Sequence, residues 1–287
     1  MTIVWSGLGM GALYALVAFT FNVPLAASGV FNFAQPQYMM LGGFLAYEGF
    51  RLHLPVIVTF ALCLAVGAAI GLVEDRVAIR PFERNTTSRA ALVTTVGFAV
   101  AMQGVAYVFW GTTPKVVPLA GSGTTLDVAG GRLGALDLTL VILAIVACLG
   151  FAVLSQRTRW GLANRAATTN PEAAQLRGIN VRGVRWLSFA IAGGLACGLG
   201  PVVAAQVTAS VDLGNNLLIL GFVALAIGGF GSYLGCLVGG FGVGLIQALG
   251  ARYLNGDWAF ILLFAVLVLL LLVRPSGLFG TKRLRVI

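Results

Sequence analysis

Residues 55–73 read PVIVTFALCLAVGAAIGLV, an uncharged run about as long as a helix needs to cross the ~30 Å hydrocarbon core of a bilayer. Eight further apolar runs accompany it, at 3–21, 36–50, 90–110, 138–155, 187–206, 217–229, 234–250 and 258–273. The runs at 36–50 and 217–229 are the shortest. We therefore predict an all-α polytopic membrane protein, with about eight to ten transmembrane helices in one domain that covers residues 1–287.

The composition excludes the other broad classes of protein. Hydrophobic residues make up 59% of the chain and charged residues 9%, whereas soluble domains carry roughly 25% charge. Disordered chains combine low hydrophobicity with high charge, so disorder is excluded as well. The net charge of +9 could suggest a nucleic-acid partner, but the basic residues lie in short stretches between apolar runs. Such a distribution is typical of membrane topology signals, and no nucleic-acid partner is expected.

The basic residues also predict the orientation of the chain. Fourteen of the 18 lie in three stretches, at 76–89, 157–185 and 274–285, which share one side in a nine-crossing arrangement. The other side holds Arg51, Lys115, Arg132 and Arg252. Because positive loops stay in the cytoplasm, the C-terminus is predicted to be cytoplasmic and the N-terminus external.

No motif for catalysis is present. Neither lysine, Lys115 or Lys282, stands in a phosphate-binding G-x-x-x-x-G-K-[ST] loop, and G-x-S-x-G and H-E-x-x-H are absent. His53 is the single histidine, so a histidine-based metal site is not expected. The cysteines have no metal-ligand spacing and are interpreted as packing residues: Cys63, Cys148, Cys197 and Cys236. The acidic residues lie at or near span ends, which argues against a proton-coupled carrier. We therefore predict that the chain is not an enzyme and that it binds no cofactor or metal of its own.

Two polar interruptions break the apolar pattern, at 22–37 and 206–216. Non-helical backbone inside a membrane is tolerated where protein or a water-filled cavity satisfies it, and paired interruptions at corresponding places indicate a transport path and an inverted repeat. The amides expected to line this path are Asn32, Gln35, Gln37, Asn215 and Asn216. Two ordinary loops are the alternative interpretation.

Two further patterns predict local structure. Glycines spaced four apart, such as Gly7/Gly11, Gly67/Gly71 and Gly240/Gly244, favour close packing of helices within the chain or against a second subunit. The segment 111–137 alternates small β-formers with turn residues, which favours a short hairpin. This segment is either a docking surface for an external partner or a solvated connector.

The segment 157–186 contains a predicted short helix at 171–177. Asn170 suits the N-cap, Pro171 the first helical position and Glu172 the positive end of the helix dipole. Gly178 suits the position after the C-terminus. About two turns of helix have a length that suits insertion into a cleft of a soluble partner.

These residues also carry a resemblance. Glu172, Ala173, Ala174 and Gly178 fit E-A-A-x-x-x-G, the cytoplasmic loop of bacterial ABC-importer permeases. Four other segments resemble the high-affinity branched-chain amino acid permeases in particular: GVFNFA (29–34), LRGIN (176–180), AIGGFGS (226–232) and VRPSGLFG (273–280). The matches run in order along most of the chain, and its length resembles the shorter of the family's two permeases.

The resemblance implies a permease subunit in a bacterial inner membrane. Its partners would be a second, paralogous permease, two cytoplasmic ATPases that bind the ATP, and an external solute-binding protein. The loop 157–186 would couple the chain to an ATPase. Branched-chain amino acids are the leading solute class. The family often has His-Gly after N-F-A where this chain has Gln35-Pro36, so urea, an amide or a small organic acid stays an alternative. A self-contained channel or secondary carrier is the alternative from another class.

Overall fold

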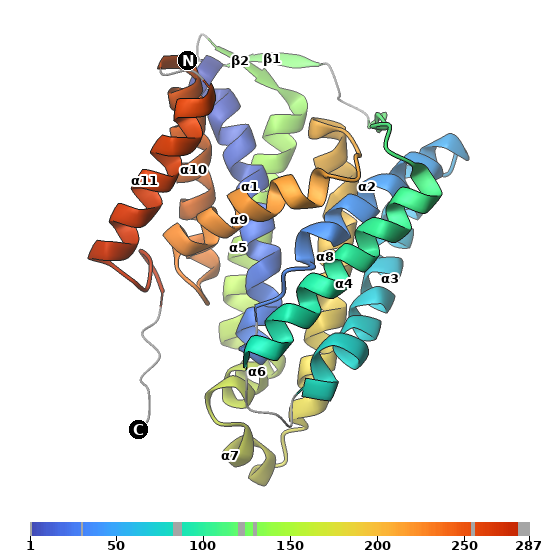
Figure 1. Ribbon diagram of the computed structural model, residues 1–287, viewed down its shortest axis with the longest axis vertical. Coiled ribbons are helices and arrows are strands. Elements are labelled where there is room, and N and C mark those ends of the chain that lie inside the picture. The colour runs from blue at the N-terminus through green and yellow to red at the C-terminus, as the bar shows by residue number, and fades with distance from the viewer. Residues whose placement is uncertain are drawn as a thin grey trace. The chain divides into compact units, whose positions relative to one another are not determined.

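The computed structural model describes residues 2–29, 31–82, 88–119, 124–128, 131–253 and 256–280 (Figure 1). Its helices, in chain order, are α1 (Thr2–Ser28), α2 (Gln35–Arg51), α3 (Val56–Glu74), the π-helical turn η1 (Asp75–Ile79), the 3-10 turn η2 (Arg80–Phe82), α4 (Ser88–Trp110), α5 (Ala135–Arg157), α6 (Arg159–Thr169), α7 (Pro171–Leu176), α8 (Val181–Val207), α9 (Leu213–Gly228), α10 (Tyr233–Tyr253) and α11 (Gly256–Val273). The nine predicted spans all coincide with helices, and the all-α polytopic class is confirmed.

Six helices of the described chain are long and apolar enough to span a membrane by length and composition, and α9 and α11 are shorter apolar helices. The inverted repeat stays a prediction. A hairpin joins β1 (Thr125–Val128) to β2 (Gly131–Gly134) in antiparallel register, which confirms the expected short hairpin. Arg84, Lys282, Arg283 and Arg285, which belong to the predicted basic stretches, lie outside the described residues.

The chain divides into two compact units, each built from segments far apart in sequence. Unit 1 comprises residues 1–22, 123–153 and 219–287, and unit 2 comprises residues 23–122 and 154–218. The single-domain prediction is not tested by this division. All ten predicted site residues belong to unit 2.

Close glycine contacts hold unit 1 together. In α1 a Cβ on Gly7 would lie 2.9 Å from the Ala248 Cβ, and one on Gly11 would lie 2.9 Å from the Phe241 Cα, both in α10. Phe19, Phe151 and Tyr233 form an aromatic cluster, in which Phe19 and Phe151 meet edge to face with their centroids 5.0 Å apart. The predicted glycine packing is thus intramolecular here.

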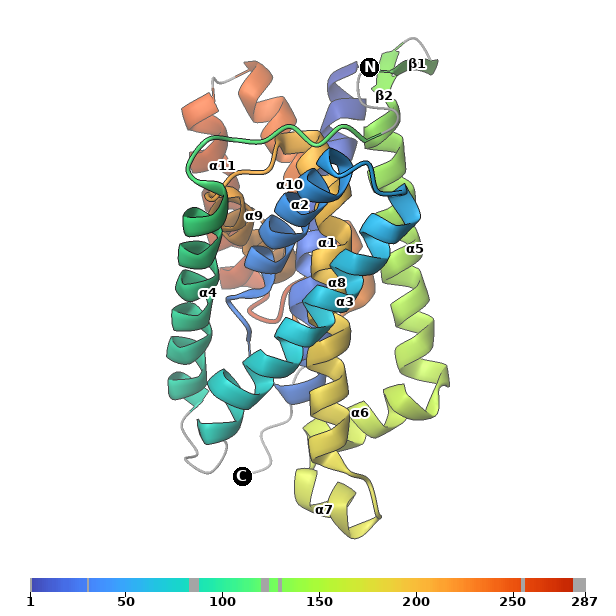
Figure 2. The same ribbon diagram turned by 90° about the vertical axis from the view of Figure 1, so that its right-hand side faces the viewer.

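In unit 2, α8 packs on α2 and α3 (Figure 2). A Cβ on Gly67 in α3 would meet the Gly193 carbonyl and the Cys197 Cβ of α8 inside contact distance. The backbones of α2 and α8 approach equally closely, since a Cβ on Gly200 would lie 2.6 Å from the Gly42 Cα. In lipid, such close approach is a main source of helix association. All four cysteines are free and buried, as expected of packing residues.

Candidate functional site

The first predicted interruption is real but shorter than the sequence suggested. Helix α1 continues past Asn22 and contains Pro24, ending only at Ser28. Asn22 is therefore helical, and its Oδ1 accepts a hydrogen bond from the Gly231 N–H at 2.9 Å within unit 1. The expected break at Asn22 is wrong because tertiary packing overrides the proline's cost to a helix.

The break between α1 and α2 is formed by residues close together in the sequence. Gly29 follows α1 with φ of 70°, a left-handed conformation that costs glycine little. Asn32 Oδ1 then accepts a hydrogen bond from the Ala34 N–H at 2.8 Å, an Asx-type turn. Pro36 stands in the first turn of α2, where its missing N–H has no helical partner to lose. The stretch that resembles G-x-x-N-F-A is thus the turn that stops one helix and starts the next.

A buried carboxylate faces this turn. Glu74 has no exposed surface, and its Oε2 accepts hydrogen bonds from Asn32 Nδ2 and from the Tyr38 hydroxyl, both at 2.8 Å. Among the described residues no cation contacts Glu74, and its Oε1 has no partner. An ionisable residue placed this way in a membrane protein is a functional-site candidate by default.

Glu74 lies near the end of its span, as expected of the acidic residues, but its complete burial was not expected. Helical backbone continues from α3 through η1 to Ile79, so both Glu74 and Asp75 lie inside one apolar helical segment. The apolar run in the sequence stops at Val73, so nothing in the sequence indicated that the helix continues beyond it. Asp75 is also buried, and its Oδ1 accepts a hydrogen bond from Arg185 Nε at 2.8 Å in an ion pair.

The second interruption separates α8 from α9. Thr208 has φ of 82°, a conformation rare for a β-branched residue. Two backbone hydrogen bonds of 2.7 and 2.9 Å hold Ala209 against Lys115, in the segment after α4. The break at 208–212 is therefore held in place by backbone hydrogen bonds to a segment about 90 residues away in sequence. Helix α9 begins just after it, at Leu213.

A chain of amides connects the two breaks. Gln37 Nε2 donates to Asn215 Oδ1 at 2.9 Å, and Asn215 Nδ2 donates to Gln103 Oε1 at 3.3 Å. Gln103 Nε2 in turn donates to the Val211 carbonyl at 3.3 Å. This chain joins α2, α4 and the start of α9 inside unit 2, so residues 178 positions apart contact each other directly.

Several buried polar atoms near the first break have no partner. Gln35 is completely buried with both side-chain amide atoms unpaired among the described residues, and Gln37 Oε1 is also unpaired. Burying such an atom without a hydrogen bond costs about 1–3 kcal/mol. A cluster of unpaired buried amides therefore offers hydrogen bonds to water or to a small polar solute.

The five predicted path residues divide into two groups. Asn32, Gln35 and Gln37 are buried, whereas Asn215 and Asn216 are exposed. Gln37 and Asn215 bond each other and Asn32 bonds Glu74, while Asn216 has no side-chain hydrogen bond within the described ranges. Water access at all five positions stays a prediction.

Sequence reasoning missed three members of the network: Tyr38, Glu74 and Gln103. Gln103 offered a signal, because an amide in the middle of the apolar run at 90–110 needs a polar partner. Tyr38 and Glu74 offered little signal in the sequence, because a tyrosine or a glutamate is common at the end of a membrane span.

The predicted coupling segment folds as its sequence indicates. Helix α7 covers Pro171–Leu176, and Asn170 Oδ1 accepts a hydrogen bond from the Ala173 N–H at 3.0 Å. Gly178 has φ of 83°, and the N–H of Ile179 reaches the Ala174 carbonyl at 3.0 Å, which is a Schellman termination. The predicted cap and stop are confirmed. Their role in coupling stays a prediction.

The rest of this segment is more ordered than expected of a loop. Helix α6 starts at a second cap, where Thr158 Oγ1 accepts from the Gly161 N–H at 3.1 Å. Ala174 is the buried contact of α7, whereas Glu172, Ala173 and Gly178 are exposed and Leu176 is 90% exposed. Figures 1 and 2 show α7 beyond the start of α8. The segment thus presents a short helix, capped at both ends, with an exposed leucine at its C-terminal end.

A family model and several relatives identify the family. Residues 3–271 match the family described as "Branched-chain amino acid transport system / permease component". The chain is 26% identical to the high-affinity branched-chain amino acid transport system permease protein BraD of Pseudomonas aeruginosa, covering 96% of this chain and 94% of that protein. LivH of Escherichia coli, named for the same system, has the same identity and coverage.

A more distant relative and a solved structure also align with the chain. A probable branched-chain amino acid transport permease protein LivH of Methanocaldococcus jannaschii is 25% identical over 93% of this chain and 89% of its own length. Among solved structures, PsaBC from Streptococcus pneumoniae in complex with Fab aligns at a TM-score of 0.48 and 10% identity, over 99% of this chain and 94% of that one.

Proposed function

This chain belongs to the family of permease components of branched-chain amino acid transport systems, and from that premise we propose that it is the transmembrane permease subunit of an ABC importer. It passes a small polar solute from an external binding protein to the cytoplasm. The observation that carries the proposal is the Gln37–Asn215 hydrogen bond of 2.9 Å, which joins the two helix breaks of unit 2. Polar groups gathered at broken helices are typical of transport sites.

The polar groups also bear on the solute. Neutral amides such as Gln35 and Gln37 can bind a zwitterion by hydrogen bonds without trapping it, as a transit site requires. Glu74 adds a carboxylate that attracts an ammonium group and repels an anion. A branched-chain or related amino acid therefore fits better than a small organic acid, with urea or an amide as the next alternative. Competition for uptake among leucine, urea and acetate in the reconstituted importer distinguishes the three classes.

The proposed assembly contains a second, paralogous permease, two cytoplasmic ATPases that bind the ATP, and the external solute-binding protein. The chain lies in the inner membrane of a bacterial cell, with its C-terminus cytoplasmic and its N-terminus external. One observation supports a cytoplasmic location for this part of unit 2: the basic residues of η1 and of the start of α8 line one pocket, and basic residues gather on the cytoplasmic side.

A self-contained channel or secondary carrier is the alternative, and the buried Glu74 is the observation in its favour. The capped helix α7 argues against it, because a channel has no need of an ordered docking helix. Solute uptake driven by a proton gradient, in vesicles that hold this chain without ATPase subunits, would establish the alternative.

Single cysteines test the proposed path. At positions 32, 35, 37, 215 and 216, in a background without the native cysteines, we expect a membrane-impermeant thiol reagent to label the path. Labelling should differ between the ATP-bound and nucleotide-free complexes because alternating access opens the breaks to one side at a time. A cysteine at Ala192, buried in α8, is the unreactive control. Labelling absent at all five positions, or equal in both states, removes the path assignment.

Glu172→Lys is expected to uncouple transport while the chain still folds and inserts. Glu172 is exposed in the first turn of α7, so reversing its charge opposes the helix dipole by only ~0.3–1 kcal/mol while changing the surface offered to an ATPase. Co-purification with the ATPase and ATP-driven uptake are measured together. Gln175→Lys, on the same exposed helix, is the matched control for added positive charge. A mutant that holds its ATPase and transports normally contradicts the coupling role.

The chain purified alone is expected neither to hydrolyse ATP nor to bind it tightly, because no phosphate-binding loop surrounds either lysine. The measurement is phosphate release and nucleotide binding in a preparation shown by mass spectrometry to be free of other subunits. Stoichiometric ATPase activity in that preparation would be incompatible with the proposal.

A further inference from the structure

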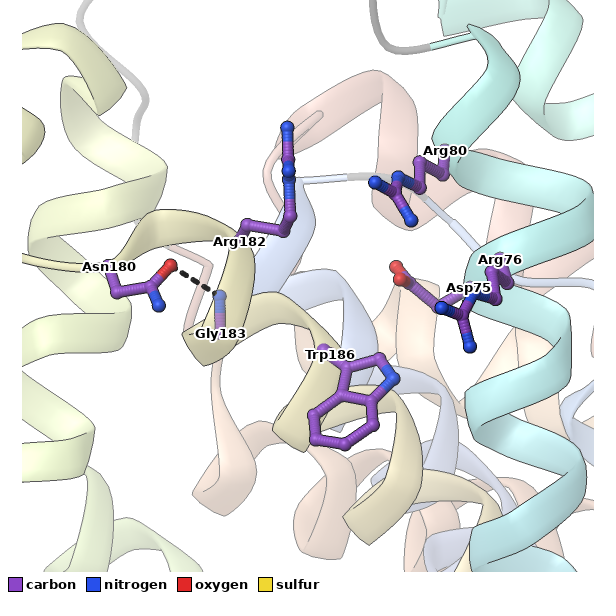
Figure 3. Close-up of a pocket in the computed structure, with 7 residues that line it drawn as sticks. All are labelled: Asp75, Arg76, Arg80, Asn180, Arg182, Gly183 and Trp186. Carbon is purple, nitrogen blue, oxygen red and sulfur yellow. Dashed lines mark hydrogen bonds between the residues drawn. The ribbon is translucent and has the colours of Figure 1, made fainter.

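A pocket of about 240 Å³ lies in unit 2 where η1 and η2 meet the start of α8. Figure 3 shows Arg76 and Arg80 on one wall and Arg182 and Trp186 on the other. The remaining lining residues are Asp75, Asn180 and Gly183. None of the amides of the proposed transport path lines this pocket.

The pocket carries a net positive charge. The negative charge of Asp75 is compensated by Arg185, whose Nε lies 2.8 Å from the Asp75 Oδ1. Arg76, Arg80 and Arg182 are exposed, and none of them forms a hydrogen bond or ion pair within the described part of the chain. Three arginines therefore line one cavity with their guanidinium donors unused, a set of groups that suits the oxygens of a phosphate.

The start of α8 adds to this field. Asn180 caps the helix through the Gly183 N–H at 2.9 Å, and both residues line the pocket, so the first turn of a 27-residue helix lies at its edge. Helix dipole and arginines act in the same direction, and both favour an anion.

The surroundings of the pocket are apolar and exposed. Val77, between Arg76 and Arg80 in sequence, is 61% exposed, and Trp186 and Leu187 are 46% and 45% exposed. Valine and leucine at the end of a membrane helix face lipid chains, and tryptophan is typical of the headgroup level. Arginines at this level extend their charged ends to the interface while their alkyl stems stay against apolar surface.

We propose that this pocket binds the phosphate of an anionic phospholipid headgroup, whose acyl chains lie against Val77, Trp186 and Leu187. A basic pocket between membrane helices beside lipid-facing side chains is suited to such a ligand. A bound lipid would link η1 to the start of α8, immediately after the exposed helix α7. The site is independent of the proposed transport path, because it shares no residue with it.

The test compares two triple variants of the full-length chain, purified in detergent with the subunits that accompany it. Arg76→Gln/Arg80→Gln/Arg182→Gln removes the pocket charge. Arg157→Gln/Arg159→Gln/Arg165→Gln removes the same charge from exposed positions of α5 and α6 outside the pocket. Native mass spectrometry measures retention of phosphatidylglycerol against phosphatidylcholine after both lipids are added in equal amounts.

We expect the wild-type chain and the control triple to retain phosphatidylglycerol preferentially. The pocket triple should lose roughly fivefold of that preference per arginine and on the order of 100-fold in all. Equal losses in both triples would reduce the effect to general surface charge and overturn the proposal. The proposal would also be overturned if millimolar inorganic phosphate displaced the lipid, which would indicate a free anion site. Lipid binding that is seen only after the ATPases have been removed would indicate a protein contact and would overturn it as well.

Folding is controlled separately. Each variant is checked by size-exclusion chromatography and thermal unfolding in detergent. If the pocket triple does not fold, Arg80→Gln and Arg182→Gln are measured singly against Arg80→Lys and Arg182→Lys. The lysine variants keep the charge and should retain most of the preference that the glutamine variants lose. Glutamine variants that bind phosphatidylglycerol as the wild type does would refute the site.

Discussion

Replacing Glu74 by glutamine is expected to lower solute uptake by about 10- to 100-fold while the chain still folds. The glutamine side chain keeps an oxygen that can accept the hydrogen bonds from Asn32 and Tyr38, both 2.8 Å long in the structure. It removes the charge that would meet an ammonium group, and a hydrogen bond to a charged group is worth about 1.5–3 kcal/mol. Uptake by the reconstituted importer and thermal unfolding of the purified chain are the two measurements.

Two further variants help to separate a loss of transport from a loss of stability. Glu74→Ala leaves two buried donors without an acceptor, so it should lower the unfolding free energy by about 2–6 kcal/mol in addition to stopping uptake. Glu48→Gln, at a partly exposed site that pairs with Arg51 at 3.4 Å, should change stability by less than about 0.5 kcal/mol. If Glu74→Gln transports at the wild-type rate, the network around Glu74 has a structural role only.

Gly67→Leu is expected to prevent unit 2 from folding stably. Even the first carbon of the new side chain would overlap the Gly193 carbonyl and the Cys197 Cβ, so α3 and α8 would have to separate. Overpacking of a well-packed core costs about 1–3 kcal/mol, and a backbone-to-backbone contact leaves no flexible neighbour to move aside. Expression level, size-exclusion profile and unfolding temperature in detergent report the loss.

Gly104→Leu in α4 is the matched control. No atom lies within 4 Å of a Cβ built on Gly104, so the substitution should be neutral or should raise stability by up to about 1 kcal/mol through helix propensity. Equal damage from both substitutions would mean that glycine content in general, rather than the α3–α8 contact, limits stability.

The positions of the helices and the ends of α7 could be predicted because both depend on local chemistry. A span needs an apolar run, since lipid offers no hydrogen bonds to the backbone. Asn170 and Gly178 act on backbone groups within a few residues of themselves, and both act as predicted. The same holds for Asn32, whose turn toward Ala34 starts at the break that the polar residues indicated.

The candidate site depended on contacts that no local pattern encodes. Gln37 and Asn215 are 178 residues apart, and Asn32 and Glu74 are 42 apart, so their pairing follows from how α2, α3, α8 and α9 fold against each other. The burial of Glu74 depended on helical backbone continuing through η1 beyond the apolar run. Sequence alone determined the membrane class, the helices and the family, because each rests on residue type and short-range hydrogen bonds. Only the tertiary structure decided which amides pair, which stay unpaired and where a carboxylate is buried, because burial and hydrogen-bond partners are properties of packed helices rather than of single segments.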